Sequence, residues 1–149
     1  MSRKGVRRMR VMAIDYGDVR TGLAVSDPTG TLAGEAFVLR ENAMDALAAA
    51  IVREATARGV GHLVVGYPKN MNGSLGPRAE KSAALAERLR GVSGLPVTLW
   101  DERRTTVDAQ RVLHTSGRHG KKNRDLVDAV AAALILEGFL RLRLISGGQ

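Results

Sequence analysis

The chain has no cysteine among its 149 residues, which excludes disulfide bonds, thiolate zinc sites and cysteine nucleophiles. Long apolar runs are also missing. The longest, Ala129–Leu136, is far shorter than the roughly 20 residues that a membrane-spanning helix needs. Near the start, Val11–Ile14 form an apolar run that is too short for the core of a signal peptide. We therefore expect a soluble protein of the cytoplasm with no membrane partner.

Aromatic residues are scarce, whereas basic residues are abundant. One tryptophan, two tyrosines and two phenylalanines are too few for an evident base-stacking platform. The 23 lysines and arginines outnumber the 15 acidic residues and give a formal net charge of +8. Basic residues gather in two clusters, one within residues 3–10 and one within 118–124. Such clusters bind a phosphate backbone, although the same charge can serve solubility alone.

Apolar periodicity and turn signals predict a single α/β domain over residues 1–149, with a basic disordered tail over 1–8. We expect strands over 10–15, 21–26, 35–39, 62–65 and 97–100, and helices over 43–58, 77–90, 106–114 and 124–142. The first helix is expected to begin after an N-cap at Asn42 and to end at Gly59. The first three strands form an antiparallel meander, and the last two, each reached through a helix, run parallel to the first strand. The expected architecture is a mixed five-stranded sheet with helices on both faces.

Acidic residues follow two of the predicted parallel strands. Asp15 comes directly after Val11–Ile14, and Asp101 and Glu102 come directly after strand 97–100. Because the ends of parallel strands meet at one edge of the sheet, where α/β proteins bind ligands, we expect these carboxylates to converge. Alternation along a strand prevents Asp101 and Glu102 from facing the same side, and the sequence does not choose between them. A simpler explanation for Asp15 is that it opens a turn.

A third acidic position lies in the last predicted helix. Asp128 interrupts the apolar stretch Leu126–Leu136, which is typical of a helix buried on most of its surface. A buried carboxylate is costly unless it is paired, hydrogen-bonded or bound to a metal. The alternative is that Asp128 stabilises the first turn of the helix through the helix dipole. Asp125, three residues earlier on the same face, is either a further ligand or the cap.

Four motifs in order resemble those of the YqgF (RuvX) family. They are Asp15-Tyr16-Gly17-x-x-Arg20-x-Gly22-x-Ala24-x-Ser26-Asp27, then Val65-Gly66-Tyr67-Pro68 with Asn72-Gly73-Ser74, then Asp101-Glu102-Arg103-x-Thr105-Thr106, and finally Asp128 with the alanine-rich helix through Glu137. The resemblance covers about residues 10 to 140. It implies an RNase H-like fold related to Holliday-junction resolvases, and a nuclease that matures the 5′ end of pre-16S rRNA.

The family's suspected acidic residues correspond here to Asp15, Glu102 and Asp128. Two positions depart from the pattern. Resolvase relatives place a glutamate directly after the fourth strand, where this chain has Gly66-Tyr67-Pro68, so Glu102 would substitute from the neighbouring strand. Many family members also carry a lysine two residues before the last aspartate, where this chain has Leu126. Lys121 and Lys122 are the substitutes that the sequence offers.

We interpret the chain as a metal-dependent nuclease of structured RNA, with branched DNA as a second substrate class. Mg²⁺ or Mn²⁺ would be held by Asp15, Glu102 and Asp128, with Asp125 or Asp101 as a further ligand. Contacts with nucleic acid are expected from six basic residues, which are Arg20, Lys69, Arg103, Lys121, Lys122 and Arg124.

Two other functions remain open. One is a non-catalytic nucleic-acid-binding module of the same fold. The other is a sugar-kinase-like or actin-like ATP-binding protein, because Asp-x-Gly after a first strand also opens the phosphate loop of that fold, although this chain is too short for two such domains. The sequence leaves open whether the protein is a monomer or a homodimer.

Overall fold

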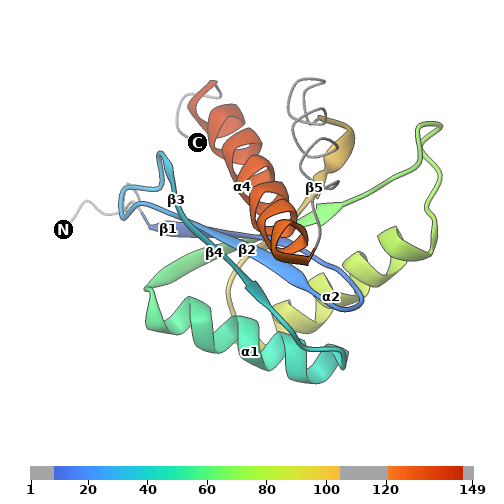
Figure 1. The fold of residues 1–149 in the computed structure, drawn as a ribbon. Coiled ribbons are helices and arrows are strands. Elements are labelled where there is room, and N and C mark those ends of the chain that lie inside the picture. Colours follow the sequence, from blue (N-terminus) through green and yellow to red (C-terminus); the bar gives the residue numbers. More distant parts are fainter. Residues whose placement is uncertain (1–8, 105–120, 146–149) are drawn as a thin grey trace.

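The sheet has the topology that the sequence predicts. The structure, a computed structural model, describes residues 9–104 and 121–145. The elements in chain order are β1 (Arg10–Asp15), β2 (Thr21–Ser26), β3 (Ala33–Leu39), α1 (Met44–Ala57), β4 (Val60–Tyr67), α2 (Pro77–Ser93), β5 (Val97–Asp101), the short 3₁₀ helix η2 (Glu102–Arg104) and α4 (Lys121–Ile145) (Figure 1). The strand order is β3-β2-β1-β4-β5. Strands β1 to β3 pair antiparallel, and β4 pairs parallel with both β1 and β5, which confirms the predicted meander and crossovers.

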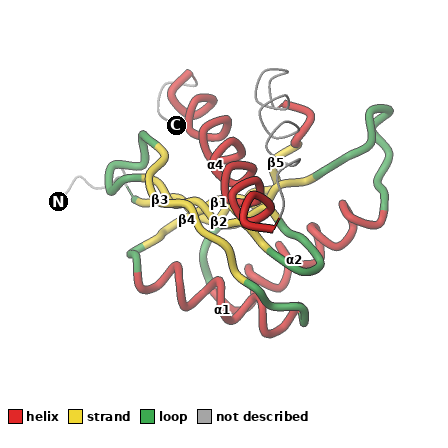
Figure 2. The backbone as a smooth tube through the Cα atoms, in the orientation of Figure 1, coloured by secondary structure: helices red, strands yellow, loops and turns green. Residues whose placement is uncertain are grey.

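Helices cover both faces of the sheet, as predicted. Helices α1 and α2 lie on one face and α4 lies across the other (Figure 2). The two faces follow from alternation along β1, since Met12 and Ile14 pack in the α1/α2 core whereas Val11 and Ala13 pack in the α4 core. Asp15 continues the second series, so the strand directs its carboxylate to the α4 face.

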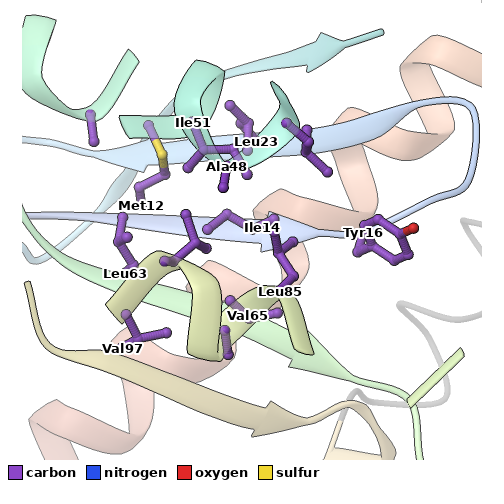
Figure 3. Close-up of a cluster of buried hydrophobic side chains, with 14 of the residues drawn as sticks. Met12, Ile14, Tyr16, Leu23, Ala48, Ile51, Leu63, Val65, Leu85 and Val97 are labelled. Carbon is purple, nitrogen blue, oxygen red and sulfur yellow. The ribbon is translucent and has the colours of Figure 1, made fainter. Parts of the chain in front are cut away.

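The larger core lies between the sheet and helices α1 and α2. Met12, Ile14 and Leu63 of the sheet pack against Ile51 of α1 and Leu85 of α2, and all five side chains are fully buried (Figure 3). Burying a side chain of this size contributes about 1.5–3 kcal/mol. This core fixes the two parallel crossovers and therefore brings the ends of β1, β4 and β5 to the same edge of the sheet.

Helix α4 packs on the second core and is less buried than its sequence suggests. Ala132, Ile135 and Leu136 contact the sheet and are buried, whereas Leu126 is 53% exposed and Leu144 is 57% exposed. The expectation of a helix buried on most of its surface was therefore wrong. The helix spans 25 residues and covers its face of the sheet alone among the described helices, so its far side faces outward.

Several predicted boundaries also shift. β4 begins at Val60 and is longer than the four residues expected. Helix α1 starts at Met44 after Ala43, with no side-chain cap, so the prediction that Asn42 caps it was wrong. Gly59 does end that helix region, with a φ of 68° that favours glycine. The predicted tail at 1–8 and the predicted helix at 106–114 lie outside the described residues. None of the described helices is long and apolar enough to cross a membrane.

Gly22 determines how closely α4 approaches the sheet. It pairs with Asp15 across the β1–β2 ladder, and a Cβ atom at this position would lie 2.0 Å from the carbonyl oxygen of Asp128. The main chain of α4 therefore rests directly on the main chain of β2. This contact brings Asp128 beside the end of β1.

We expect the substitution Gly22→Ala to lower the free energy of unfolding by about 1–3 kcal/mol, because the added methyl group overpacks the contact with Asp128. Gly91→Ala is the control, since nothing lies within 4 Å of a Cβ there and alanine is favoured in a helix by up to about 1 kcal/mol. Urea unfolding of the two variants measures the difference. An unchanged midpoint for Gly22→Ala would show that α4 can move off β2 without cost.

Candidate active site

Asp15 is the central carboxylate of the site. It ends β1 on the α4 face and is partly buried. Its pKa is raised from 3.8 to about 7, chiefly by burial and also by the charges of Glu102 and Asp128, while the charge of Arg78 opposes the increase. None of the described residues donates a side-chain hydrogen bond to this carboxylate or forms an ion pair with it. The fold thus holds an acid where its charged form is poorly stabilised.

Glu102, the first residue of η2 directly after β5, reaches the same face. Trp100 of β5 packs in the α4 core, and Glu102 follows two residues later. Its carboxylate lies over Gly66 of β4, where an added Cβ would be 2.4 Å from Glu102 Oε2. Burial raises the pKa of Glu102, with Arg78 opposing. The absence of a side chain at Gly66 is therefore what lets a residue from the neighbouring strand place its carboxylate on β4.

Asp101 is engaged elsewhere. Arg103 Nε lies 3.0 Å from both of its carboxylate oxygens, and Arg103 Nη2 lies 2.6 Å from Oδ2. The main-chain N–H of Arg103 also donates to Asp101 Oδ1 at 2.9 Å. These hydrogen bonds lower the pKa of Asp101 to about 2. Between the two acids that the sequence could not separate, Glu102 interacts with Asp15 and Asp101 is paired with Arg103.

Asp128 is held by Arg20. Arg20 Nε donates to Asp128 Oδ2 at 2.7 Å and lies 3.6 Å from Asp125 Oδ1. Arg40 pairs with the other oxygen of Asp125. Asp128 is close enough to raise the pKa of Asp15, yet its carboxylate is tied to a guanidinium. Arg20, directly before β2, joins that strand to the first turns of α4, and its predicted contact with nucleic acid stays a prediction.

The other predicted basic residues lie around this edge or outside the description. Lys69 Nζ is 5.6 Å from the ring centre of Tyr67. Arg103 lies beside the 68–76 loop, 3.7 Å from where a Cβ of Gly73 would be. Arg124 is exposed near the start of α4. Lys121 and Lys122 begin that helix, and their side chains lie outside the described part of the chain.

Arg78 is a residue that the sequence analysis missed. It is the second residue of α2, and its Nη2 donates to the carbonyl oxygen of Tyr16 at 3.0 Å. Its charge lowers the pKa values of both Asp15 and Glu102. The available signal was its position directly after Gly76-Pro77, because a helix that starts there begins at the same sheet edge as the two acids.

The chemistry of these donors fits a hard divalent cation. Among residues 9–104 and 121–145, no three Asp, Glu or His side chains are grouped as a ready metal cage. Mg²⁺ does not require one, since it is commonly bound by one or two carboxylates together with water and substrate phosphate. Asp15 and Glu102 repel each other and have no hydrogen-bond donor among the described side chains. A cation between them would remove that repulsion.

We expect Asp15→Asn to stabilise the metal-free protein at pH 8. Between pH 4 and pH 7 native Asp15 keeps a proton that the unfolded chain has released, so the free energy of unfolding falls as pH rises through this range. The variant avoids this loss of roughly 1–4 kcal/mol, since a tenfold change in acidity corresponds to about 1.4 kcal/mol.

Thermal unfolding in EDTA between pH 4 and pH 8 checks this prediction. Asp27→Asn is the control of opposite sign, because hydrogen bonds, the largest from the main-chain N–H of Thr31, lower the pKa of Asp27. That variant should lose stability at neutral pH. If the melting temperatures of wild type and Asp15→Asn change equally with pH, the raised pKa of Asp15 is contradicted.

We expect Gly66→Ala to displace the Glu102 carboxylate and to weaken Mn²⁺ binding, because the new methyl group overlaps both Glu102 and Ile135 Cδ1. The 2.4 Å gap to Glu102 Oε2 resembles the distance from Cβ to a carboxylate oxygen within an aspartate. The triple variant Gly66→Asp, Glu102→Ala, Ile135→Val should therefore recover binding by calorimetry, whereas Glu102→Ala alone should not. Failure of this rescue in a folded protein would contradict the shared location.

Solved structures of resolvases share this architecture. RuvC of Thermus thermophilus, in complex with a Holliday junction, matches with a TM-score of 0.60 and 16% identity over 91% of this chain and 96% of RuvC. The fowlpox virus resolvase in complex with Holliday junction DNA matches with a TM-score of 0.56 and 13% identity over 91% of this chain and 99% of the resolvase. These likenesses establish the RNase H-like fold, which confirms the predicted fold class.

Relatives with far higher sequence identity carry the name "Putative pre-16S rRNA nuclease". The one from Pelotomaculum thermopropionicum is 42% identical over 146 residues, which cover 95% of both chains. The one from Moorella thermoacetica is 45% identical over 132 residues, which cover 89% of this chain and 94% of that one. The model of the RuvX family, described as Holliday junction resolvase, matches residues 9–142. The chain therefore belongs to the RuvX family, as its four motifs indicated.

Proposed function

We propose that the chain is a metal-dependent nuclease that cleaves phosphodiester bonds in structured RNA, with Asp15, Glu102 and Asp128 as its metal-binding acids. The observation that carries this proposal is the pair of carboxylates Asp15, at the end of β1, and Glu102, directly after β5, which meet at one edge of the sheet and whose pKa values are both raised. Carboxylates with raised pKa values cluster at functional sites, where a bound cation or a reaction uses them. The family and the names of its relatives agree with this activity.

The proposed substrate is pre-16S rRNA, which the names of the relatives suggest, cut at its 5′ end, with branched DNA as a second class. The net charge of +8 suits a polyanion of either kind. The proposal places the protein in the cytoplasm, where bacterial ribosomal RNA is processed. Monomer and homodimer remain the two candidate states.

In the proposed mechanism, a bound Mg²⁺ or Mn²⁺ supplies an activated water and stabilises the leaving oxygen. Asp15 and Glu102 hold the cation from β1 and from the end of β5. Asp128 would be the third ligand, and Arg20, whose Nε donates to Asp128 Oδ2, would position its carboxylate. Asp101 and Asp125 are weaker candidate ligands, because Arg103 and Arg40 occupy them.

The basic residues around this edge have a separate proposed role. Lys69 lies within the 68–76 loop and Arg103 lies beside it, and Lys121, Lys122 and Arg124 lie at the start of α4. We propose that these residues contact substrate phosphates on the two sides of the acids. Such contacts set orientation and affinity and carry no sequence information of their own.

We expect Asp15→Asn to lower cleavage at least about a hundredfold, because the cation loses a charged ligand. The assay uses an end-labelled transcript of the pre-16S rRNA 5′ region and a labelled four-way DNA junction, each with Mn²⁺, Mg²⁺ or EDTA. Asp45→Asn is the control, since this 79%-exposed carboxylate lies on α1 beside Arg88. It should leave cleavage unchanged.

The non-catalytic alternative gives a different pattern. Because no ready three-ligand cage exists among the described residues, a binding module of the same fold is the main competitor. Tight binding of either substrate without metal-dependent cutting, equal in wild type and Asp15→Asn, would establish the binding module and reject the nuclease. Cutting that EDTA abolishes, and that is lost in Asp15→Asn, would reject the binding module.

A further inference from the structure

Arg78 holds a fixed position beside the carboxylate pair. It belongs to the first turn of α2, and its Nη2 is anchored by the carbonyl oxygen of Tyr16 at 3.0 Å. Tyr16 directly follows Asp15 and is buried in the α1/α2 core, so its main chain is a rigid anchor. A Cβ on Gly17 would lie 3.7 Å from the same guanidinium nitrogen. The guanidinium therefore sits on the turn that follows the central acid.

The Arg78 guanidinium lies near Asp15 and Glu102 but forms no ion pair with either carboxylate. Its charge acts on both Asp15 and Glu102, yet within residues 9–104 and 121–145 it forms no ion pair within 4.0 Å, and its single hydrogen bond is to Tyr16. A guanidinium carries five N–H donors. Most of the donors of Arg78 thus have no partner in the described part of the chain and are available to a ligand.

Arg78 differs in this respect from other arginines near the site. Arg20 pairs with Asp128 and Arg40 pairs with Asp125, and Arg103 keeps only part of its guanidinium for a phosphate because it also pairs with Asp101. A phosphate that approaches Asp15 and Glu102 meets their negative charge, so a neighbouring cation on the protein would favour its approach. The forked geometry of a guanidinium matches phosphate oxygens and can bind them in pairs.

We propose that Arg78 is a substrate-binding residue whose guanidinium binds a phosphate of the nucleic-acid backbone beside Asp15 and Glu102. The inference rests on the proposed function, since it requires a polyanionic substrate at this edge of the sheet. It assigns a phosphate subsite to the first turn of α2. It also makes α2, which packs on the opposite face of the sheet from α4, part of the substrate surface.

Two other roles of Arg78 would explain its position without any substrate contact. The first is to dock the turn after β1 onto α2, which Lys81 also does through Asp18 at 3.2 Å. The second is to neutralise part of the charge of the two acids. Each role predicts a distinct response. Lys81→Gln in the same helix tests the docking role, and Mn²⁺ binding by Arg78→Gln tests the neutralising role.

The experiment measures binding of a fluorescein-labelled pre-16S rRNA 5′ fragment in EDTA, by anisotropy, over a series of KCl concentrations. We expect Arg78→Gln to weaken binding about 10- to 100-fold, as for the loss of hydrogen bonds to a charged group. The plot of log affinity against log salt should become shallower by about one. Arg78→Lys should keep the salt slope and lose part of the affinity.

The controls remove the same charge from the same helix. Lys81→Gln breaks the neighbouring contact with the turn, and Arg88→Gln removes an exposed cation paired with Asp45. Both should stay within about threefold of wild type in RNA affinity. Equal losses in Arg78→Gln and Lys81→Gln would show that Arg78 only docks the turn, and would overturn the proposal.

Mn²⁺ binding without nucleic acid provides the second readout. Arg78→Gln should bind Mn²⁺ as tightly as wild type or more tightly, because a positive charge near the two acids is removed. Tighter Mn²⁺ binding with unchanged RNA affinity and an unchanged salt slope would mean that Arg78 only neutralises the acids, and would overturn the proposal. Unchanged or tighter Mn²⁺ binding also shows that the variant is folded.

The result is separable from the fate of the nuclease. If wild type binds the RNA in EDTA but does not cut it with metal, the proposed catalysis fails while the Arg78 result still decides the phosphate subsite. If wild type binds neither the RNA fragment nor the four-way junction, both proposals are wrong.

Discussion

The site depends on two places where the α4 face of the sheet has no side chain. At Gly22 the main chain of α4 rests on β2, and at Gly66 the carboxylate of Glu102 rests on β4. Asp15 of β1 lies on the strand between them. A methyl group at either position would separate elements that must meet at atomic contact. Close packing at these two glycines, and not attraction between charges, therefore brings the three acids near one another.

Once the acids are brought together, electrostatics works against them. Burial raises the pKa values of both Asp15 and Glu102, and the charge of Glu102 raises that of Asp15 further. No described side chain donates a hydrogen bond to either carboxylate. By contrast, Asp101 and Asp128, one step further out, are paired with arginines. The two central carboxylates, Asp15 and Glu102, thus lack a positively charged partner within ion-pair distance among the described residues, whereas the two outer ones, Asp101 and Asp128, each have one. The repulsion between Asp15 and Glu102 lowers the stability of the fold, and a bound cation would restore it. The ion pairs of Asp101 and Asp128 hold the surrounding main chain in place.

The sequence predicted the features that local patterns determine. Strand β1 and its end at Asp15 follow from a short apolar run, and the strand order follows from the helices between strands. The choice between Asp101 and Glu102 could not be made, because it depends on where β5 gives way to η2 and on the space above Gly66. The pairing of Arg20 with Asp128 joins residues 108 positions apart. Arg78 was missed for a similar reason, since its partner is a main-chain oxygen that no sequence pattern marks.

The empty position at Gly66 also bears on how proteins of this fold diverge. A side chain rooted at 66 and one rooted at 102 compete for a single volume, so only one of these columns in an alignment can hold the acid in any one protein. A lineage can transfer the acid from one strand to the next through a pair of compensating changes while the carboxylate stays in place. A comparison of aligned sequences would score such a protein as lacking the acid. A comparison of structures would find a carboxylate in the same place, carried by a different strand.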